Sequence, residues 1–227
     1  MTNWSARFGC RSILRSPVKP PFLSTTSVIP TLIESIRLVN GELPLLDYHQ
    51  QRVDRSRRAH YGKAPAFRLL EVINGLPLPE TGTHKLRLTY GVDLESYEVT
   101  PYLVKPVTSL RVVQGDHLVY SRKYADRSGI RDLYGQRGDC DDILITQRQH
   151  ITDTSYANVA LHDGSHWYTP AWPLLRGTRR AYLLEAGLLR SSLIRQRDLH
   201  NFERIRLINA MLPWEEGPTL SSAAVVE

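Results

Sequence analysis

Alternating hydrophobic and polar residues mark several short strands in the first half of the chain. Residues 32–38, LIESIRL, alternate in this way and predict a strand. Asn40-Gly41 follows and is the residue pair most typical of a tight hairpin turn, so residues 42–46 are expected to return as the next strand. Two later segments, KLRLTYG at 85–91 and SYEVTPYLV at 96–104, predict a further pair of strands.

Two helices are expected between these pairs of strands. Asp47 can cap a helix across YHQQRVDRSRRAHYG, residues 48–62. A second, shorter helix is expected over residues 66–73, where Asn74-Gly75 ends it. The resulting β-β-α-α-β-β order predicts a small α+β domain over residues 29–104.

The second half of the chain has a different pattern. Residues 142–170 contain short strands interrupted by turn residues. LLRGTRRAYLLEAGLL at 174–189 predicts a turn that opens a helix, and RLINAML at 206–212 predicts a late strand that ends in a turn. We interpret residues 105–112 as a connector and residues 113–227 as a larger, β-rich domain.

The composition is that of an ordinary globular protein with a basic surplus. Of the 227 residues 41% are hydrophobic, and 29 basic against 23 acidic residues give a net charge of +6. The basic residues are spread along the chain and no zinc-finger or RNA-binding signature accompanies them, so nucleic-acid binding is not favoured. No apolar run approaches the ~20 residues that span a bilayer. Cys10 and Cys140 form no disulfide framework, which favours a reducing compartment, and we expect a cytoplasmic protein.

The first 28 residues differ from the rest of the chain. They contain basic residues and serines but no acidic residue, a composition typical of a transit peptide as well as of a disordered leader. Pro17, Pro20 and Pro21 oppose a regular helix there, which favours the disordered leader.

Many common catalytic motifs are absent from the sequence. It contains no nucleophile elbow, Walker loop, H-E-x-x-H or dinucleotide fingerprint. His162, Asp163 and His166 lie across an Asp-Gly turn, and the acidic segment 138–142 leads into a strand, so both are interpreted as loops. We therefore expect no metal site.

Six weaker signals follow one another in a set order along the chain. Taken singly, each is typical of a surface segment, a turn or a cap. Gly177 and Thr178 stand at a predicted helix start, a geometry that binds phosphate through backbone N–H groups. The six segments are HQQR (49–52), YSRKYADRSG (120–129), ITDTSYAN (151–158), YTP (168–170), LLRGTRRA (174–181) and INAM (208–211).

In this order the segments resemble the class IV aminotransferases, a family that includes branched-chain and D-amino-acid aminotransferases and 4-amino-4-deoxychorismate lyase. The resemblance covers about residues 31–213. It implies the two-domain α+β fold of D-amino-acid aminotransferase, in which a small α+β domain and a larger β-rich pseudo-barrel enclose pyridoxal 5′-phosphate (PLP). It also implies a homodimer that acts on a small-molecule amine, with neither nucleic acid nor a membrane as partner.

The resemblance assigns three residues to the centre of the site. Lys123 resembles the lysine that holds PLP covalently and moves a proton, for which its amine needs a lowered pKa. Asp153 resembles the acid that pairs with the pyridine nitrogen and keeps the ring an electron sink. Arg52 resembles the arginine whose forked guanidinium grips the cofactor phosphate.

Further phosphate contacts are implied at two turns, where backbone N–H groups would face the anion. The residues concerned are Gly177, Thr178 and Arg179 at the helix start, and Asn209 and Ala210 in the late turn.

The remaining carried-over positions concern the ring and the substrate. Leu175 matches the residue that packs on the face of the ring. Arg87 aligns loosely with an arginine that binds the substrate carboxylate, and it can equally be a plain strand residue. Asp153 stands where most family members carry Glu, and Arg179 stands where aminotransferases often carry Thr.

The late turn distinguishes between activities within the family. LINAMLP, residues 207–213, is more similar to the ending of the lyases than to the Gly/Thr-rich segment of the aminotransferases. The leading hypothesis is a carbon–carbon lyase, similar to 4-amino-4-deoxychorismate lyase, that releases pyruvate. The alternative is an aminotransferase acting on an amino acid and a 2-oxo acid, and a third reading is a non-enzymatic basic binding module.

Overall fold

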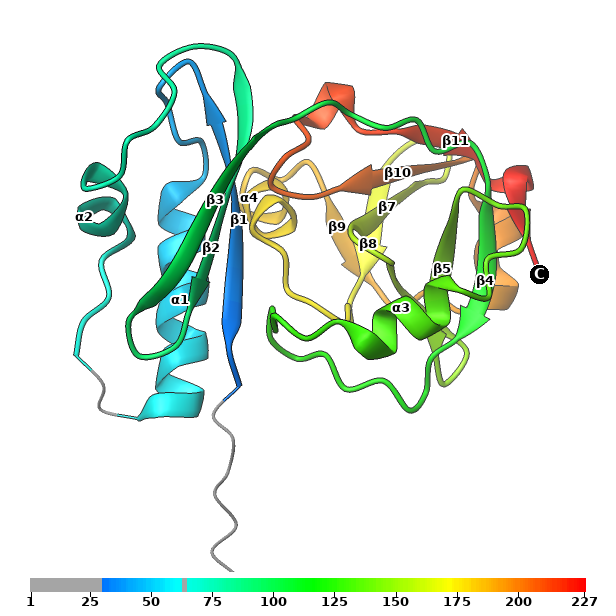
Figure 1. The fold of residues 1–227 in the computed structure, drawn as a ribbon. Coiled ribbons are helices and arrows are strands. Elements are labelled where there is room, and N and C mark those ends of the chain that lie inside the picture. The colour runs from blue at the N-terminus through cyan, green and yellow to red at the C-terminus, as the bar shows by residue number, and fades with distance from the viewer. Residues whose placement is uncertain (1–29, 63–64) are drawn as a thin grey trace, which may run out of the picture.

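A computed structural model describes residues 30–62 and 65–227. The leader predicted for residues 1–28 lies outside the described residues. The described chain forms a small sheet with two helices and a larger, strongly curved sheet beside it (Figure 1).

The small sheet has three antiparallel strands in the order β1-β2-β3. Its elements are β1 (Leu32–Val39), α1 (Leu46–Tyr61), α2 (Leu69–Asn74), β2 (Thr83–Tyr90) and β3 (Leu94–Pro101). The strands expected at 32–38, 85–91 and 96–104 are confirmed within a few residues. Leu32, Ile36 and Leu86 pack under the helices on one face of the sheet, and the intervening residues face the larger sheet.

The strand expected over residues 42–46 is wrong. Asn40 and Gly41 do turn the chain, with φ of 48° and 81°, but Glu42 pairs only with Val39. Pro44 has no N–H to donate and Leu45 adopts φ 66°, so the ladder ends after one bridge and the chain enters α1. The small sheet consequently has three strands rather than four.

Both helices of this part differ from the prediction at their first residues. Helix α1 begins at Leu46, so Asp47 lies inside the first turn and is not the cap; there its charge still suits the positive end of the helix dipole. Helix α2 begins at Leu69, later than expected. Local sequence signals locate helix ends only within a few residues, which accounts for both differences.

The larger sheet has nine strands, with the path β11-β10-β7-β6-β5-β4-β12 and with β8 and β9 branching from β7. Its elements are β4 (Leu110–Gln114), α3 (Ser128–Tyr134), β5 (Asp142–Gln147), β6 (His150–Thr154), β7 (Asn158–His162), β8 (Trp167–Pro170), α4 (Thr178–Glu185), β9 (Arg190–Ser192), β10 (Arg204–Ile208), β11 (Thr219–Ser221), β12 (Val225–Val226) and the 3-10 turns Gln196–Asn201, Trp214–Glu216 and Ser222–Ala224. The predicted α+β class is confirmed. The last three residues of the predicted connector, 110–112, belong instead to β4.

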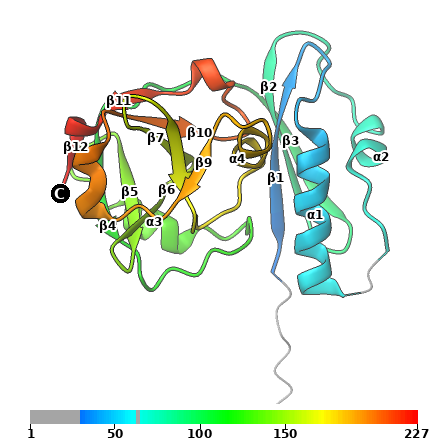
Figure 2. The same cartoon turned by 180° about the vertical axis from the view of Figure 1, so that it is seen from behind.

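The curved sheet encloses its own core, and a second set of contacts joins it to the small sheet. Helix α4 lies between the two sheets, on the opposite side of β1 from α1 (Figure 2). Tyr48 of α1 donates a hydrogen bond to Glu185 at the end of α4, at 2.8 Å. None of the helices in the described residues is both long and apolar enough to cross a membrane.

Candidate functional site

A cavity of about 250 Å³ opens between the two sheets. All residues that the sequence assigned to the site line this cavity, except Arg179. They arrive from separate places in the chain: α1, β2, the segment before α3, β6, the start of α4 and the turn after β10. The fold therefore brings five of the six ordered motifs together around one space, and YTP (168–170) does not line it.

Lys123 lies on a segment that extends the small sheet. The backbone N–H of Ile33 donates to the Lys123 carbonyl, and the N–H of Ala125 donates to the Thr31 carbonyl, each at 2.9 Å. This pairing holds the Lys123 backbone beside β1, while its side chain lines the cavity. Burial, and then the positive charge of Arg52, lower the pKa of the amine to about 7. A large fraction of this lysine is consequently neutral near physiological pH.

Asp153 lies on β6 with only 5% of its surface exposed. Its Oδ1 accepts a hydrogen bond from Asn158 Nδ2 at 2.8 Å, and its Oδ2 accepts one from the Leu175 N–H at 2.9 Å. Asn158 Nδ2 also donates to the Leu175 carbonyl at 2.8 Å. Burial raises the pKa of Asp153 to about 7, although both hydrogen bonds oppose the rise.

Gly177 and Thr178 form the start of α4 where it meets the cavity. A Cβ at position 177 would lie 2.1 Å from Asn158 Oδ1, so only glycine fits against this side chain. The Oγ1 of Thr178 is buried and has no hydrogen-bond partner among the described residues. The N–H groups of the first helical turn lack intrahelical acceptors, so the hydroxyl and these donors together form a site for an anion.

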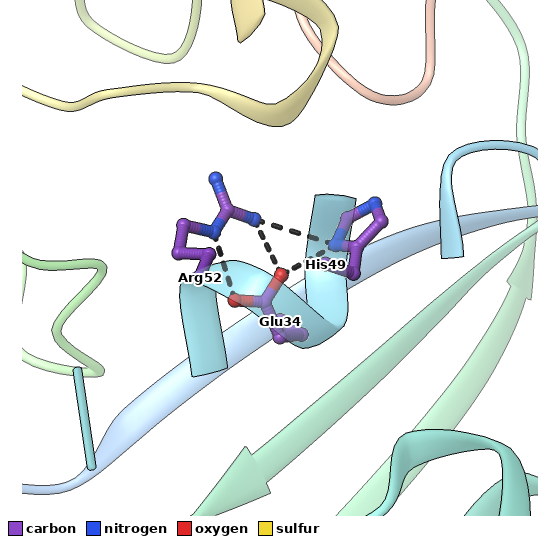
Figure 3. A network of polar contacts seen from close by, with 3 residues as sticks. All are labelled: Glu34, His49 and Arg52. Atoms are coloured by element: carbon purple, nitrogen blue, oxygen red, sulfur yellow. Dashed lines mark hydrogen bonds and ion pairs between the residues drawn. The ribbon is translucent and has the colours of Figure 1, made fainter. Parts of the chain in front are cut away.

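Arg52 is engaged differently from the expected grip on a phosphate. Its Nε donates to Glu34 Oε1 at 2.9 Å, and its Nη2 contacts Glu34 Oε2 (Figure 3). His49 Nδ1 lies 2.6 Å from the same Oε2. The fork of this guanidinium is therefore occupied by a carboxylate of the protein itself.

Arg179 does not reach the cavity. Its side chain is buried, and its guanidinium lies over the Tyr182 ring, 5.8 Å from the centroid. Its Nε has no hydrogen-bond partner among the described residues. Arg179 can contribute to an anion site only through its backbone N–H.

Several residues that line or support the cavity escaped the sequence analysis. Lys85 lies on the same face of β2 as Arg87, and the two-residue period of the strand could have identified it. Arg127 precedes α3 and donates to the Ser155 carbonyl, an arrangement with no local sequence signal. Glu34 forms the ion pair with Arg52, and its place in the same two-residue period as the apolar Leu32 and Ile36 was the sign of a buried charge there. Among the described residues, no three His, Cys, Asp or Glu side chains gather as a metal site would require.

Known proteins share both the sequence and the fold. The family model for amino-transferase class IV matches residues 116–215. An uncharacterized protein of Haemophilus influenzae is 38% identical over 183 residues, which cover 79% of this chain and 97% of that protein. A crystal structure from Haemophilus somnus 129PT, described as a "putative 4-amino-4-deoxychorismate lyase", is 34% identical with a TM-score of 0.74 and covers 80% of this chain and 96% of its own.

More distant structures share the fold alone. A hypothetical aminotransferase from Mycobacterium tuberculosis, solved in a PLP-bound form, is 17% identical with a TM-score of 0.68. The alignment covers 90% of this chain and 87% of that one. Sequence identity over most of the chain, the matching family model and the shared fold agree with the residues gathered at the cavity. The chain belongs to the class IV aminotransferase family of PLP-dependent enzymes.

Proposed function

We propose that this enzyme is a lyase similar to 4-amino-4-deoxychorismate lyase, which acts on an amine with two carboxylates and releases pyruvate. The observation that carries the proposal is the charge of the cavity. Five basic side chains line it, Arg52, Lys85, Arg87, Lys123 and Arg127, whereas Asp153 is the one carboxylate among its described lining residues. A cofactor phosphate accounts for part of this excess, and a dicarboxylate substrate matches the remainder. The similarity to the Haemophilus somnus protein supports the same activity.

The residues at the cavity fit PLP. A buried lysine with a lowered pKa suits covalent attachment of an aldehyde, and the buried carboxyl of Asp153 in the same cavity suits a protonated pyridine nitrogen. The orphan hydroxyl of Thr178 and the first turn of α4 suit the phosphate. When bound, PLP supplies an electron sink that lets a proton leave the amine-bearing carbon of the substrate.

The protein residues then have separable tasks. Lys123, neutral for much of the time, accepts the proton from the amine-bearing carbon and later returns it. Asp153 would pair with the ring nitrogen of the cofactor, and Asn158 keeps this carboxylate in place. Lys85 and Arg87 on β2 and Arg127 before α3 offer cationic positions for two substrate carboxylates.

A labelling experiment tests the cofactor and its attachment. The purified protein loaded with PLP should be yellow, and borohydride reduction should fix the cofactor to the peptide that contains Lys123. The other described lysines, Lys85 and Lys105, do not combine burial with a place at the cavity, so a label on either of them, or on any other lysine than Lys123, would overturn the assignment.

A product assay separates the lyase from the aminotransferase. Aminodeoxychorismate is supplied without any 2-oxo acid, and 4-aminobenzoate and pyruvate are followed over many turnovers. The lyase leaves nitrogen on the ring product, so it needs no acceptor and should continue. Absence of product, together with steady nitrogen exchange between an amino acid and 2-oxoglutarate, would establish the aminotransferase instead.

We also propose that the enzyme is a homodimer, the assembly that the family resemblance implies. Sedimentation of the full chain with bound PLP should then give twice the chain mass of 25.9 kDa. A monomer across the micromolar range would refute this.

A further inference from the structure

Glu34 is a fully buried carboxylate in the middle of β1. Its side chain has no exposed surface and points toward α1 (Figure 3), and it does not line the cavity. Both of its oxygens are engaged: Oε1 by Arg52 Nε at 2.9 Å, and Oε2 by Arg52 Nη2 and His49 Nδ1. A buried charge of this kind is retained only when its partners satisfy it fully, as they do here.

The ionisation states within this group follow from its contacts. Burial alone would raise the pKa of Glu34, but the charge of Arg52 and the hydrogen bond of His49 outweigh it and lower the pKa to about 2. Burial lowers the pKa of His49, so its ring is neutral and Nδ1 must carry the proton that it donates to Glu34. Glu34 is therefore ionised and holds the guanidinium of Arg52 as an ion pair, while His49 adds a neutral hydrogen bond.

That geometry leaves one end of Arg52 for the cavity. Nε and Nη2 both face Glu34. Nη1 has no hydrogen-bond partner among the described residues and points away from Glu34 (Figure 3). Arg52 nevertheless lines the cavity. We propose that Glu34 is a positioning residue that fixes Arg52 so that it meets the cofactor phosphate end-on, through Nη1. The inference rests on the proposed PLP site.

The proposal divides the phosphate contacts between two elements. An arginine held by two bonds to a buried acid keeps a single side-chain conformation and loses little further entropy when the anion arrives. Because its fork is already used, Arg52 can supply only one nitrogen to the phosphate. The remaining contacts must come from the Thr178 hydroxyl and the first turn of α4.

Glu34→Asp tests this while it preserves the charge. The shorter side chain withdraws the carboxylate by about 1.5 Å, so it cannot hold both Nε and Nη2. Binding of PLP and of pyridoxal, which lacks the phosphate, is compared on the apoenzyme. We expect Glu34→Asp to weaken PLP binding by about tenfold, as one misplaced charge-assisted hydrogen bond would, and to leave pyridoxal binding unchanged. Glu71→Asp, the same change at an exposed glutamate of α2, is the matched control.

Arg52→Lys keeps the test decisive if Glu34→Asp folds poorly, and a double variant adds a check where Glu34→Asp does fold. Arg52→Lys should lose its preference for PLP over pyridoxal as fully as Arg52→Ala, because a compact ammonium drawn to Glu34 cannot also reach the position that Nη1 occupies in Arg52. Adding Glu34→Asp to Arg52→Ala should cause no additional loss.

The outcomes against the proposal are distinct from failure of the PLP site itself. Equal weakening of PLP and pyridoxal binding, or none, in Glu34→Asp would overturn it, as would wild-type PLP affinity in Arg52→Lys. If the wild-type protein takes up no PLP at all, the proposed function fails instead.

Discussion

Replacing Gly177 by alanine tests how the start of α4 and the buried acid depend on each other. The backbone at Gly177 has φ −69° and ψ 151°, which alanine adopts without strain. The new methyl group would instead meet Asn158 Oδ1 at 2.1 Å. Since this approach is far inside van der Waals contact, the Asn158 side chain must leave its position.

The loss of stability in Gly177→Ala follows from the hydrogen bonds that Asn158 makes. Its Nδ2 donates to Asp153 Oδ1 and to the Leu175 carbonyl, each at 2.8 Å. A hydrogen bond to a carboxylate contributes about 1.5–3 kcal/mol and a neutral one about 0.5–1.5 kcal/mol, so the free energy of unfolding should fall by about 2–4 kcal/mol. The hydrogen bond of Asn158 also lowers the pKa of Asp153, so its loss should raise that pKa further above about 7.

Urea unfolding of the apoenzyme at pH 7 measures the first effect, and the pH dependence of PLP binding measures the second. The ionised form of Asp153 pairs with the cofactor, so tight binding should require a higher pH in Gly177→Ala than in the wild type. Gly75→Ala is the matched control, because its methyl group would meet nothing closer than the Val72 carbonyl at 3.5 Å. If the two variants are destabilised equally and PLP binding shows the same pH dependence in both, the coupling through Asn158 does not exist.

Three other measurements test the remaining assignments. The rate at which the apoenzyme takes up PLP should rise with pH and level off above about 7, because the pKa of Lys123 is lowered and only the neutral amine attacks. Stopped-flow absorbance measures this rate. A rate that still rises steeply toward pH 10, near the ordinary lysine pKa, would contradict the lowered pKa. Arg52→Ala should weaken PLP binding by about 1.5–3 kcal/mol in an equilibrium titration. An unchanged titration would show that Arg52 stabilises the fold without binding the cofactor. Arg127→Ala should raise KM for a dicarboxylate amine by about tenfold or more and leave that for a monocarboxylate amine unchanged; an equal rise for both would remove Arg127 from substrate recognition.

The sequence by itself determined the strands with clear alternation and the order of the motifs. Residues 32–38 and 85–91 form strands because a period of two matches a half-buried sheet in any tertiary context. The ordered motifs also led to Lys123 and Asp153, which the structure places on the walls of one cavity. Their catalytic roles remain predictions that the labelling and titration experiments address.

Short-range patterns failed at two features, at one because a local cue was outweighed and at the other because a distant residue decides the outcome. The strand expected over residues 42–46 was lost because Pro44 cannot continue a ladder, a local cue that the hairpin signal outweighed. The direction of Arg52 depends on Glu34, 18 residues earlier on another element, and no helical or strand period relates the two.

Only the tertiary structure decided how the cavity is charged and how its groups ionise. Lys85 comes from β2 and Arg127 from the segment before α3, and they meet at the cavity because α4 and the Lys123 segment hold the two sheets together. The pKa values of Lys123 and Asp153 both move to about 7 because each is buried, and burial is a property of the folded chain rather than of its local sequence.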